Sequence, residues 1–326
     1  MIEKNLNIYI PGEYTYPAAY GFEPFLHSYL HEDAEIRPVI LIAPGGGYRF
    51  VSPSEGEIVA RSFYEKGWNC FVFTYTVNSL DLAPLNAQPL HDISRTVRFV
   101  RKNAEEFRID PERFAVCGFS AAGHLCASLA VHYQDDVEEN VEYAGVSNKP
   151  QGAVLCYPVI TSGEFAHRDS FTALLGADAS AEMLHYMSLE TQVTADTVPC
   201  FIWQTETDDL VPVENSYLMA EALRKEKIPY ALHVFTDGAH GLSVATDDWA
   251  DGKYQDPYTM AQTMKLIEGV KDGTIEAAEE RKQEFLQIFD PEQREQSSDA
   301  YRPQPNPEAA VWPALADQWL RKIFEL

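Results

Sequence analysis

Short apolar segments recur along the chain, and their length and composition predict β-strands. Most of them carry large aliphatic or aromatic residues at nearly every position rather than at alternate ones. This pattern is typical of strands that are buried on both faces of a parallel sheet. The predicted strands span residues 6–10, 38–43, 69–75, 113–118, 152–157, 199–204 and 230–235.

Amphipathic helical patterns lie between these strands. Leu90, Ile93, Val97 and Val100 recur at helical spacing with charged residues on the opposite face, and residues 215–225 have a similar pattern. Alternation of strands with helices is typical of an open, doubly wound sheet that has helices on both faces. We therefore expect an α/β fold with a mostly parallel sheet.

Two later segments break this alternation, and a final helix follows them. Residues 161–197 lie between two predicted strands and have the pattern of short helices and loops, so we expect a cap-like segment within a core of residues 1–245. Residues 246–310 are polar, acidic and mostly helical, and we interpret them as an insertion. Residues 311–326 contain an amphipathic pattern that predicts a C-terminal helix returning to the core.

Composition narrows the classes of partner. The 326 residues carry a formal net charge of -25, which repels phosphate backbones and anionic headgroups, so we expect neither nucleic acid nor a membrane as a partner. The N-terminus lacks the pattern of a secretion signal, and the apolar runs are too short to span a bilayer. The five cysteines form no CxxC pair and lie mostly in apolar runs, which is typical of free thiols in a reducing compartment. We therefore expect a cytoplasmic location.

The strongest chemical signal surrounds Ser120, where a predicted strand meets a predicted helix. Gly118, Ala121 and Ala122 are the small neighbours that a tight strand-to-helix turn requires. Such a turn lifts the serine oxygen clear of the backbone, and the helix that begins at Ala121 directs free N–H groups toward it. Taken alone, the motif also fits a structural serine at a helix N-terminus.

A second signal is the run of glycines that follows the strand 38–43. Three consecutive glycines are entropically costly, so the backbone must approach another group closely or adopt positive φ there. The N–H groups of Gly46 and Gly47, with that of Ala121, are candidate donors to a developing oxyanion. No Gly-Lys-Ser/Thr or G-x-G-x-x-G spacing is present, which disfavours a nucleotide loop.

Two further signals also follow predicted strands. Asp208 and Asp209 come after the strand 199–204 and are both candidate acids, although either could instead cap the next helix. His240, bracketed by glycines, comes after the strand 230–235. The order nucleophile, acid, base is that of an α/β-hydrolase, with His240 as the base for Ser120 and the acid fixing its imidazole tautomer.

With these motifs in place, the chain resembles α/β-hydrolases related to acetylxylan esterases and hormone-sensitive-lipase-like carboxylesterases, from about residue 38 to residue 242. The resemblance rests on segments 44–48, 110–111, 118–125, 156–160, 211–216 and 238–242. It implies a serine esterase that deacetylates sugars or cleaves short-acyl esters, without a metal or organic cofactor. It also implies that Asp208 is the acid, because that position lies three residues before the valine of Val211-Pro212. Ala122 and Pro44 depart from the glycine and histidine that are common in the family.

Several other residues have weaker functional or structural expectations. Tyr48 is a weak candidate for the substrate pocket, and Glu55 and Glu57 are expected to support the first turn of a helix. The histidines show no metal-ligand spacing, so we expect no metal. The insertion begins shortly after His240 and either narrows the pocket or forms an arm for a homo-oligomer. The leading hypothesis is an esterase for small-molecule esters, possibly acetylated carbohydrates. The alternatives are a serine peptidase and a non-catalytic binding protein of the same fold.

Overall fold

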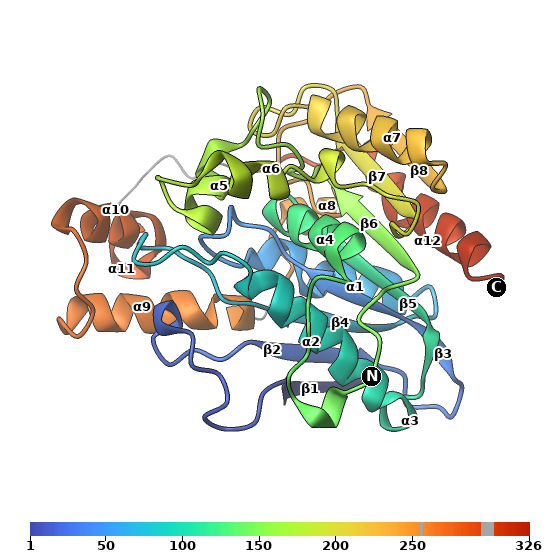
Figure 1. Ribbon diagram of the computed structural model, residues 1–326, viewed down its shortest axis with the longest axis horizontal. Helices are drawn as coiled ribbons and strands as arrows, with labels where there is room; N and C mark the ends of the chain where they lie inside the picture. The colour runs from blue at the N-terminus through green and yellow to red at the C-terminus, as the bar shows by residue number, and fades with distance from the viewer. Residues whose placement is uncertain (255–256, 295–302) are drawn as a thin grey trace.

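The computed structural model describes residues 1–254, 257–294 and 303–326, and these residues form an eight-stranded sheet with the order β1-β2-β4-β3-β5-β6-β7-β8 (Figure 1). The pairs β1–β2 and β2–β4 are antiparallel, and the remaining pairs are parallel. The predicted mostly parallel sheet is therefore confirmed. Its strands are β1 (Ile2–Asn7), β2 (Phe25–Leu30), β3 (Arg37–Ala43), β4 (Asn69–Thr74), β5 (Ile109–Phe119), β6 (Gly152–Cys156), β7 (Cys200–Thr205) and β8 (Tyr230–Phe235).

Helices cover both faces of the sheet, which explains why its central strands are apolar throughout. One apolar core packs beneath α2 (Gln88–Lys102), α4 (Ala121–His132) and α7 (Glu214–Glu226). A second core lies on the opposite face beneath α1 (Glu57–Tyr64) and α12 (Trp312–Ile323). In that core, Trp312 stacks on Trp203 with ring centroids 5.3 Å apart, so the C-terminal helix is packed directly on the sheet.

The parallel register determines where the chemistry gathers. Ala43 pairs with Gly118, Phe119 with Cys156, and Thr205 with Phe235. The carboxyl ends of β3, β5, β7 and β8 therefore meet at one edge of the sheet. Loops that leave these ends lie side by side, which is where sites form in open α/β sheets.

The N-terminal prediction was wrong in two respects. The first strand is Ile2–Asn7 rather than 6–10, and β2 was not predicted. Ile8 and Tyr9 are buried beyond the end of β1, and the Tyr9 hydroxyl donates to Asp92 at 2.6 Å. The apolar run at 6–10 thus reflects packing against α2, whereas β1 needs only backbone pairing with β2 at the edge of the sheet.

Both irregular segments contain short helices joined by loops in the part that the structure describes. Residues 161–197 contain α5 (Arg168–Leu175) and α6 (Ala181–Tyr186). Residues 246–310 contain α8 (Asp247–Ala250), α9 (Ala261–Lys271), α10 (Glu279–Phe289) and α11 (Pro291–Arg294), while residues 255–256 and 295–302 of this predicted insertion lie outside the described part. Phe285 of α10 packs in a small apolar cluster with Leu80, Leu266, Ile267 and Ile275.

Figure 1 shows α9, α10 and α11 grouped on one side of the molecule, away from α7 and α12. The remaining short helix, α3 (Ala104–Phe107), precedes β5. Among the described residues, no helix has the length and apolar character needed to cross a membrane.

Candidate active site

Ser120 occupies a strained turn between β5 and α4. Its φ is 52° and its ψ is −119°, a region that non-glycine residues rarely adopt. The turn is stabilised by the Ser120 N–H, which donates to the Cys156 carbonyl at 3.0 Å. The side chain at Gly118 must be absent, because a Cβ there would lie 2.1 Å from the Ala122 carbonyl oxygen. The predicted strand-to-helix turn is therefore present, and it presents Ser120 at the sheet edge.

His240 lies between Ser120 and Asp208. Its Nε2 is 2.8 Å from Ser120 Oγ, and its Nδ1 is 2.8 Å from Asp208 Oδ2. The Asp208 side chain is 1% exposed and also accepts hydrogen bonds from the N–H groups of Leu210 and Val211 at 3.0 and 2.8 Å. The structure thus brings together three side chains that are distant in the chain, in a geometry suited to moving a proton off the serine hydroxyl.

Asp209 has a different environment from its neighbour. Its Oδ1 accepts the backbone N–H of His240 at 2.9 Å, and the residue is exposed. It therefore contacts the backbone of the histidine loop, whereas Asp208 contacts the imidazole ring. This geometry separates two carboxylates that the local sequence leaves equivalent.

The glycine run forms a loop beside Ser120. Gly46 has a φ of +126°, and a Cβ there would lie 2.1 Å from the Phe50 carbonyl oxygen. Within the described part of the chain, the N–H groups of Gly46 and Gly47 donate to no other protein group. The N–H of Ala121 belongs to the first turn of α4, where no preceding helical carbonyl is available. These three donors are free to meet a negative charge near Ser120.

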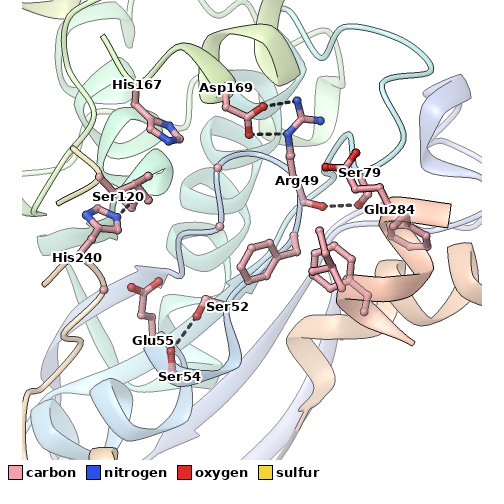
Figure 2. Close-up of a pocket in the computed structure, with 18 of the residues that line it drawn as sticks. Arg49, Ser52, Ser54, Glu55, Ser79, Ser120, His167, Asp169, His240 and Glu284 are labelled. Carbon is pink, nitrogen blue, oxygen red and sulfur yellow. Dashed lines mark hydrogen bonds and ion pairs between the residues drawn. The ribbon is translucent and has the colours of Figure 1, made fainter. Parts of the chain in front are cut away.

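A cavity of about 500 Å³ opens beside Ser120 and His240. Figure 2 shows Ser120, His240 and Glu55 on one side of it and Glu284, which belongs to α10, on the other. The helix α10 therefore forms a wall of the cavity. The described residues that line it include Gly46, Gly47, Arg49, Phe50, Ser79, Ser120, His167, Asp169, Leu210, His240, Arg281, Glu284, Phe285, Ile288 and Phe289.

A cluster of four charged residues, which we call the Arg49 cluster, joins three parts of the cavity wall. Arg49 binds Asp169 with two hydrogen bonds of 2.7 and 2.6 Å and binds Asp81 at 2.7 Å. Asp81 in turn forms an ion pair with Arg281 of α10 at 3.2 Å. This cluster could not be predicted from the sequence, because its members are far apart in the chain and form no local motif.

Two expectations about side chains near the site need correction. Tyr48 does not line the cavity; it is 2% exposed, and its hydroxyl lies 3.0 Å from His124 Nδ1. Burial lowers the pKa of His124 to about 4, so this imidazole is neutral and can accept from Tyr48. Glu57 lies in the first turn of α1 as expected, but Glu55 instead bonds Gly45 and Tyr157.

Metal ions in proteins are held chiefly by histidine, cysteine, aspartate and glutamate side chains. Across the ranges 1–254, 257–294 and 303–326, no group of three or more histidine, cysteine, aspartate or glutamate side chains is placed to hold a metal ion. The acidic residues that line the cavity are Glu55, Asp169 and Glu284, and each is bonded to another protein group.

Comparison with known proteins identifies a family and several relatives. The model of the BD-FAE family matches residues 26–223. Endo-1,4-beta-xylanase B of Butyrivibrio fibrisolvens is 52% identical over 259 residues, which are 79% of this chain and 41% of that protein. An acetylxylan esterase of Xylanibacter ruminicola is 27% identical over 258 residues, which are 77% of this chain and 50% of that protein. The chain thus spans about half the length of these curated relatives or less.

Two solved structures resemble this one over most of its length. The acetyl ester-xyloside bifunctional hydrolase of Caldicellulosiruptor lactoaceticus has a TM-score of 0.70 and 33% identity, covering 84% of this chain and 97% of its own. MGS-M1, described as an alpha/beta hydrolase enzyme from a Medee basin deep-sea metagenome library, has a TM-score of 0.63 and 25% identity, covering 100% of this chain and 99% of its own.

Proposed function

The chain belongs to the BD-FAE family and is an esterase-like α/β-hydrolase, and from this premise we propose that it cleaves esters with Ser120 as nucleophile, His240 as base and Asp208 as the acid that orients the base. One observation carries the proposal: His240 lies 2.8 Å from both Ser120 Oγ and Asp208 Oδ2, beside a cavity of about 500 Å³. A nucleophile, a base and an orienting acid are the parts that covalent acyl transfer needs.

In this mechanism the proton of Ser120 moves to His240 Nε2 while Oγ attacks the carbonyl carbon of the ester. The Nδ1–H of His240 donates to Asp208, which fixes the tautomer and stabilises the imidazolium. His240 then protonates the departing alcohol, which leaves an acyl group on Ser120. Water, deprotonated by the same imidazole, hydrolyses that acyl-enzyme and restores the serine.

The charge that develops on the carbonyl oxygen needs donors close to Ser120. We assign this role to the N–H groups of Gly46 and Gly47, which line the same cavity as Ser120, and of Ala121, which directly follows Ser120. These groups have no competing acceptor among the described residues. Each such donor typically contributes about 3 kcal/mol to transition-state stabilisation. The positive φ of Gly46 supports this assignment, because it lets the loop turn its N–H groups inward.

The substrate class follows from the cavity and from the relatives. The cavity combines aromatic side chains, such as Phe50 and Phe289, with polar ones, such as Arg49 and His167. Two relatives have names that pair an acetyl ester with a xylose-containing sugar. We therefore propose a small-molecule ester, in particular an acetylated carbohydrate, as the substrate.

Glycoside hydrolysis is less well supported, although one relative is named as a xylanase. Glycosidases need two carboxyl groups that flank the scissile bond. Among the described lining residues, Glu55 accepts from Gly45 and Tyr157, Asp169 accepts from Arg49, and Glu284 accepts from Arg281. Each of these carboxylates already accepts a hydrogen bond from another group of the chain, whereas Ser120 and His240 face the cavity.

Substrate profiling tests the proposal. The purified chain should release p-nitrophenol from its acetate ester and acetate from acetylated xylo-oligosaccharides. Aminoacyl-nitroanilides, which report a peptidase, should be cleaved far more slowly. Cleavage of the anilides without ester hydrolysis would replace the esterase by a peptidase, and inactivity on every substrate would favour a binding protein.

A further inference from the structure

Glu55 is a buried carboxylate at the site that the proposed reaction does not use. It ends the short helix Pro53–Glu55 and is 4% exposed. Its Oε2 accepts the Gly45 N–H at 2.7 Å, and its Oε1 accepts the Tyr157 hydroxyl at 2.6 Å. Burial raises the pKa of Glu55, and the bonds from Tyr157 and Gly45 oppose that rise. A buried carboxylate with a raised pKa beside a proposed active site is a candidate for a functional role.

The bond to Gly45 fixes the glycine loop. Gly45 directly precedes Gly46 and Gly47, the proposed oxyanion donors. The loop is closely packed here, since a Cβ on Gly45 would lie 2.6 Å from the Phe119 carbonyl oxygen and 3.0 Å from Ser120 Cβ. The Glu55 carboxylate therefore fixes the position of the Gly45 N–H. Because Gly46 and Gly47 follow directly, this bond also influences how their N–H groups approach Ser120.

The bond to Tyr157 reaches the loop that carries the base. The Tyr157 hydroxyl accepts the Ser243 N–H at 3.0 Å, and the Tyr157 ring lies edge-to-face with His240 at a centroid distance of 5.0 Å. Ser243 is held in addition by its own hydroxyl, which donates to the Ser54 carbonyl at 2.6 Å. Glu55 and Tyr157 thus connect the glycine loop to the His240 loop through three hydrogen bonds.

Proton accounting shows why the residue must be an acid. The Ser243 N–H donates to Tyr157, the Tyr157 O–H donates to Glu55, and the Gly45 N–H donates to the other oxygen of Glu55. Two donors therefore face two acceptor atoms. A glutamine offers only one acceptor oxygen, so one donor would lose its partner or face an NH₂ group.

We propose that Glu55 is a positioning residue that holds the oxyanion-binding glycine loop in register with the His240 loop through Tyr157. The inference rests on the proposed ester hydrolysis and extends it to a residue that has no step of its own in that mechanism. Binding of the ground-state ester depends mainly on the cavity walls, so the contribution of Glu55 belongs to the transition state.

The test compares Glu55→Gln with wild type in ester hydrolysis and in binding of trifluoroacetophenone, whose ketone adds to a serine as a tetrahedral mimic. We expect kcat to fall about 10²-fold, the effect typical of misplaced catalytic groups. The KM should change by less than about threefold, and the affinity for the ketone should fall in parallel with kcat/KM. Tyr157→Phe removes the hydroxyl from the other end of the link and should act in the same direction.

Asp92 and Tyr9 provide matched controls. Asp92 is fully buried and accepts the Tyr9 hydroxyl at 2.6 Å, but neither residue lines the cavity. Asp92→Asn and Tyr9→Phe make the same chemical changes elsewhere in the core and should leave kcat and ketone affinity unaltered. Thermal unfolding of each variant establishes the fraction folded. If Glu55→Gln does not fold, Tyr157→Phe provides the test.

The possible outcomes distinguish a failure of the positioning role of Glu55 from a failure of the proposed ester hydrolysis. If Ser120→Ala is inactive while folded Glu55→Gln and Tyr157→Phe match wild type in kcat and ketone affinity, the positioning role is wrong and the esterase stands. A loss of kcat without any loss of ketone affinity also overturns the role. If Ser120→Ala remains as active as wild type, the proposed function itself fails.

Discussion

Ser120 illustrates how a single residue is prepared for chemistry at the cost of local strain. Its positive φ belongs to a region that costs on the order of 1–3 kcal/mol and persists only when the surroundings enforce it. Here the Ser120 carbonyl accepts the N–H groups of His124 and Val159 at 3.2 and 3.1 Å. These bonds fix the turn from both sides, so the hydroxyl needs no rearrangement to meet His240.

The different contacts of Asp208 and Asp209 with His240 give a prediction at the residue scale. Asp208→Asn should lower kcat by roughly 10⁴-fold, because the amide no longer fixes the productive tautomer of His240. Asp209→Asn should stay within about tenfold of wild type, since it alters one hydrogen bond to the His240 backbone. Steady-state kinetics on p-nitrophenyl acetate distinguish the two. Equal losses in both variants would contradict the assignment of Asp208.

A second prediction concerns stability and the buried carboxyl of Asp92. Burial raises its pKa from 3.8 to about 6, so the folded chain binds this proton more tightly than the unfolded chain. The associated stabilisation is present below pH 4 and is lost as the pH rises through 6, a change of about 3 kcal/mol. The asparagine side chain of the Asp92→Asn variant cannot ionise. Its stability relative to wild type should therefore increase between pH 4 and pH 7.

Chemical denaturation of wild type and Asp92→Asn at several pH values measures this difference directly. Comparing the two proteins at each pH removes the contribution of the other titrating groups. A difference in unfolding free energy that stays constant across the range would show that Asp92 titrates alike in the folded and unfolded chains.

Local signatures decided which site residues could be predicted from the sequence. Ser120 and the glycines each follow a buried strand, and His240 follows the partly buried edge strand β8. All have small neighbours, so their placement needed no knowledge of contacts. The choice of Asp208 over Asp209 required the family resemblance. Arg49 and Glu55 were beyond reach, because their partners Asp169 and Tyr157 lie 120 and 102 positions away.

At the scale of elements, the central strands were predictable because burial on both faces leaves an apolar run. β2 was not, since its sequence includes His27 and Ser28, which are nonetheless buried. Their polar atoms are satisfied in part by Asn5 and by the backbone of β1, which is a pairing between strands that no single segment reveals. Strands of this kind depend on their neighbours more than on their composition.

The helix α10 is the element that we expect to set substrate size. Phe289 packs on Phe50 and on Phe285, each with ring centroids 5.3 Å apart, and all three line the cavity. Phe289→Ala should open this wall and raise kcat/KM for bulky acyl esters relative to acetate by about tenfold, the range that apolar pocket contacts typically provide. A series of p-nitrophenyl esters of graded acyl length measures the change.

Phe99 supplies the matched control for that prediction. It lies on α2, is half-buried as Phe289 is, and packs on Phe107 of α3, outside the residues that line the cavity. Phe99→Ala should leave the acyl-length profile as in wild type. An unchanged profile in Phe289→Ala would mean that α10 does not contact the acyl group.

At the scale of the whole molecule, the fold gathers four loops that are far apart in the chain. The glycine loop, Ser120, Asp208 and His240 follow β3, β5, β7 and β8, whose carboxyl ends share one edge of the sheet. The helix α10 then adds a wall that the core alone lacks. The net charge of -25 on the whole molecule disfavours the approach of anionic esters, whereas neutral esters meet no such penalty.

The central claim is that Ser120 is the nucleophile, and covalent labelling tests it most directly. A fluorophosphonate reacts with a serine only where a base activates the hydroxyl, so the wild-type chain should be labelled on Ser120 and lose its esterase activity in step with labelling. Peptide mapping by mass spectrometry identifies the modified residue. His240→Ala should label far more slowly, and Ser120→Ala should not be labelled. Labelling at another serine, or stoichiometric labelling of Ser120 with full activity retained, would contradict the account.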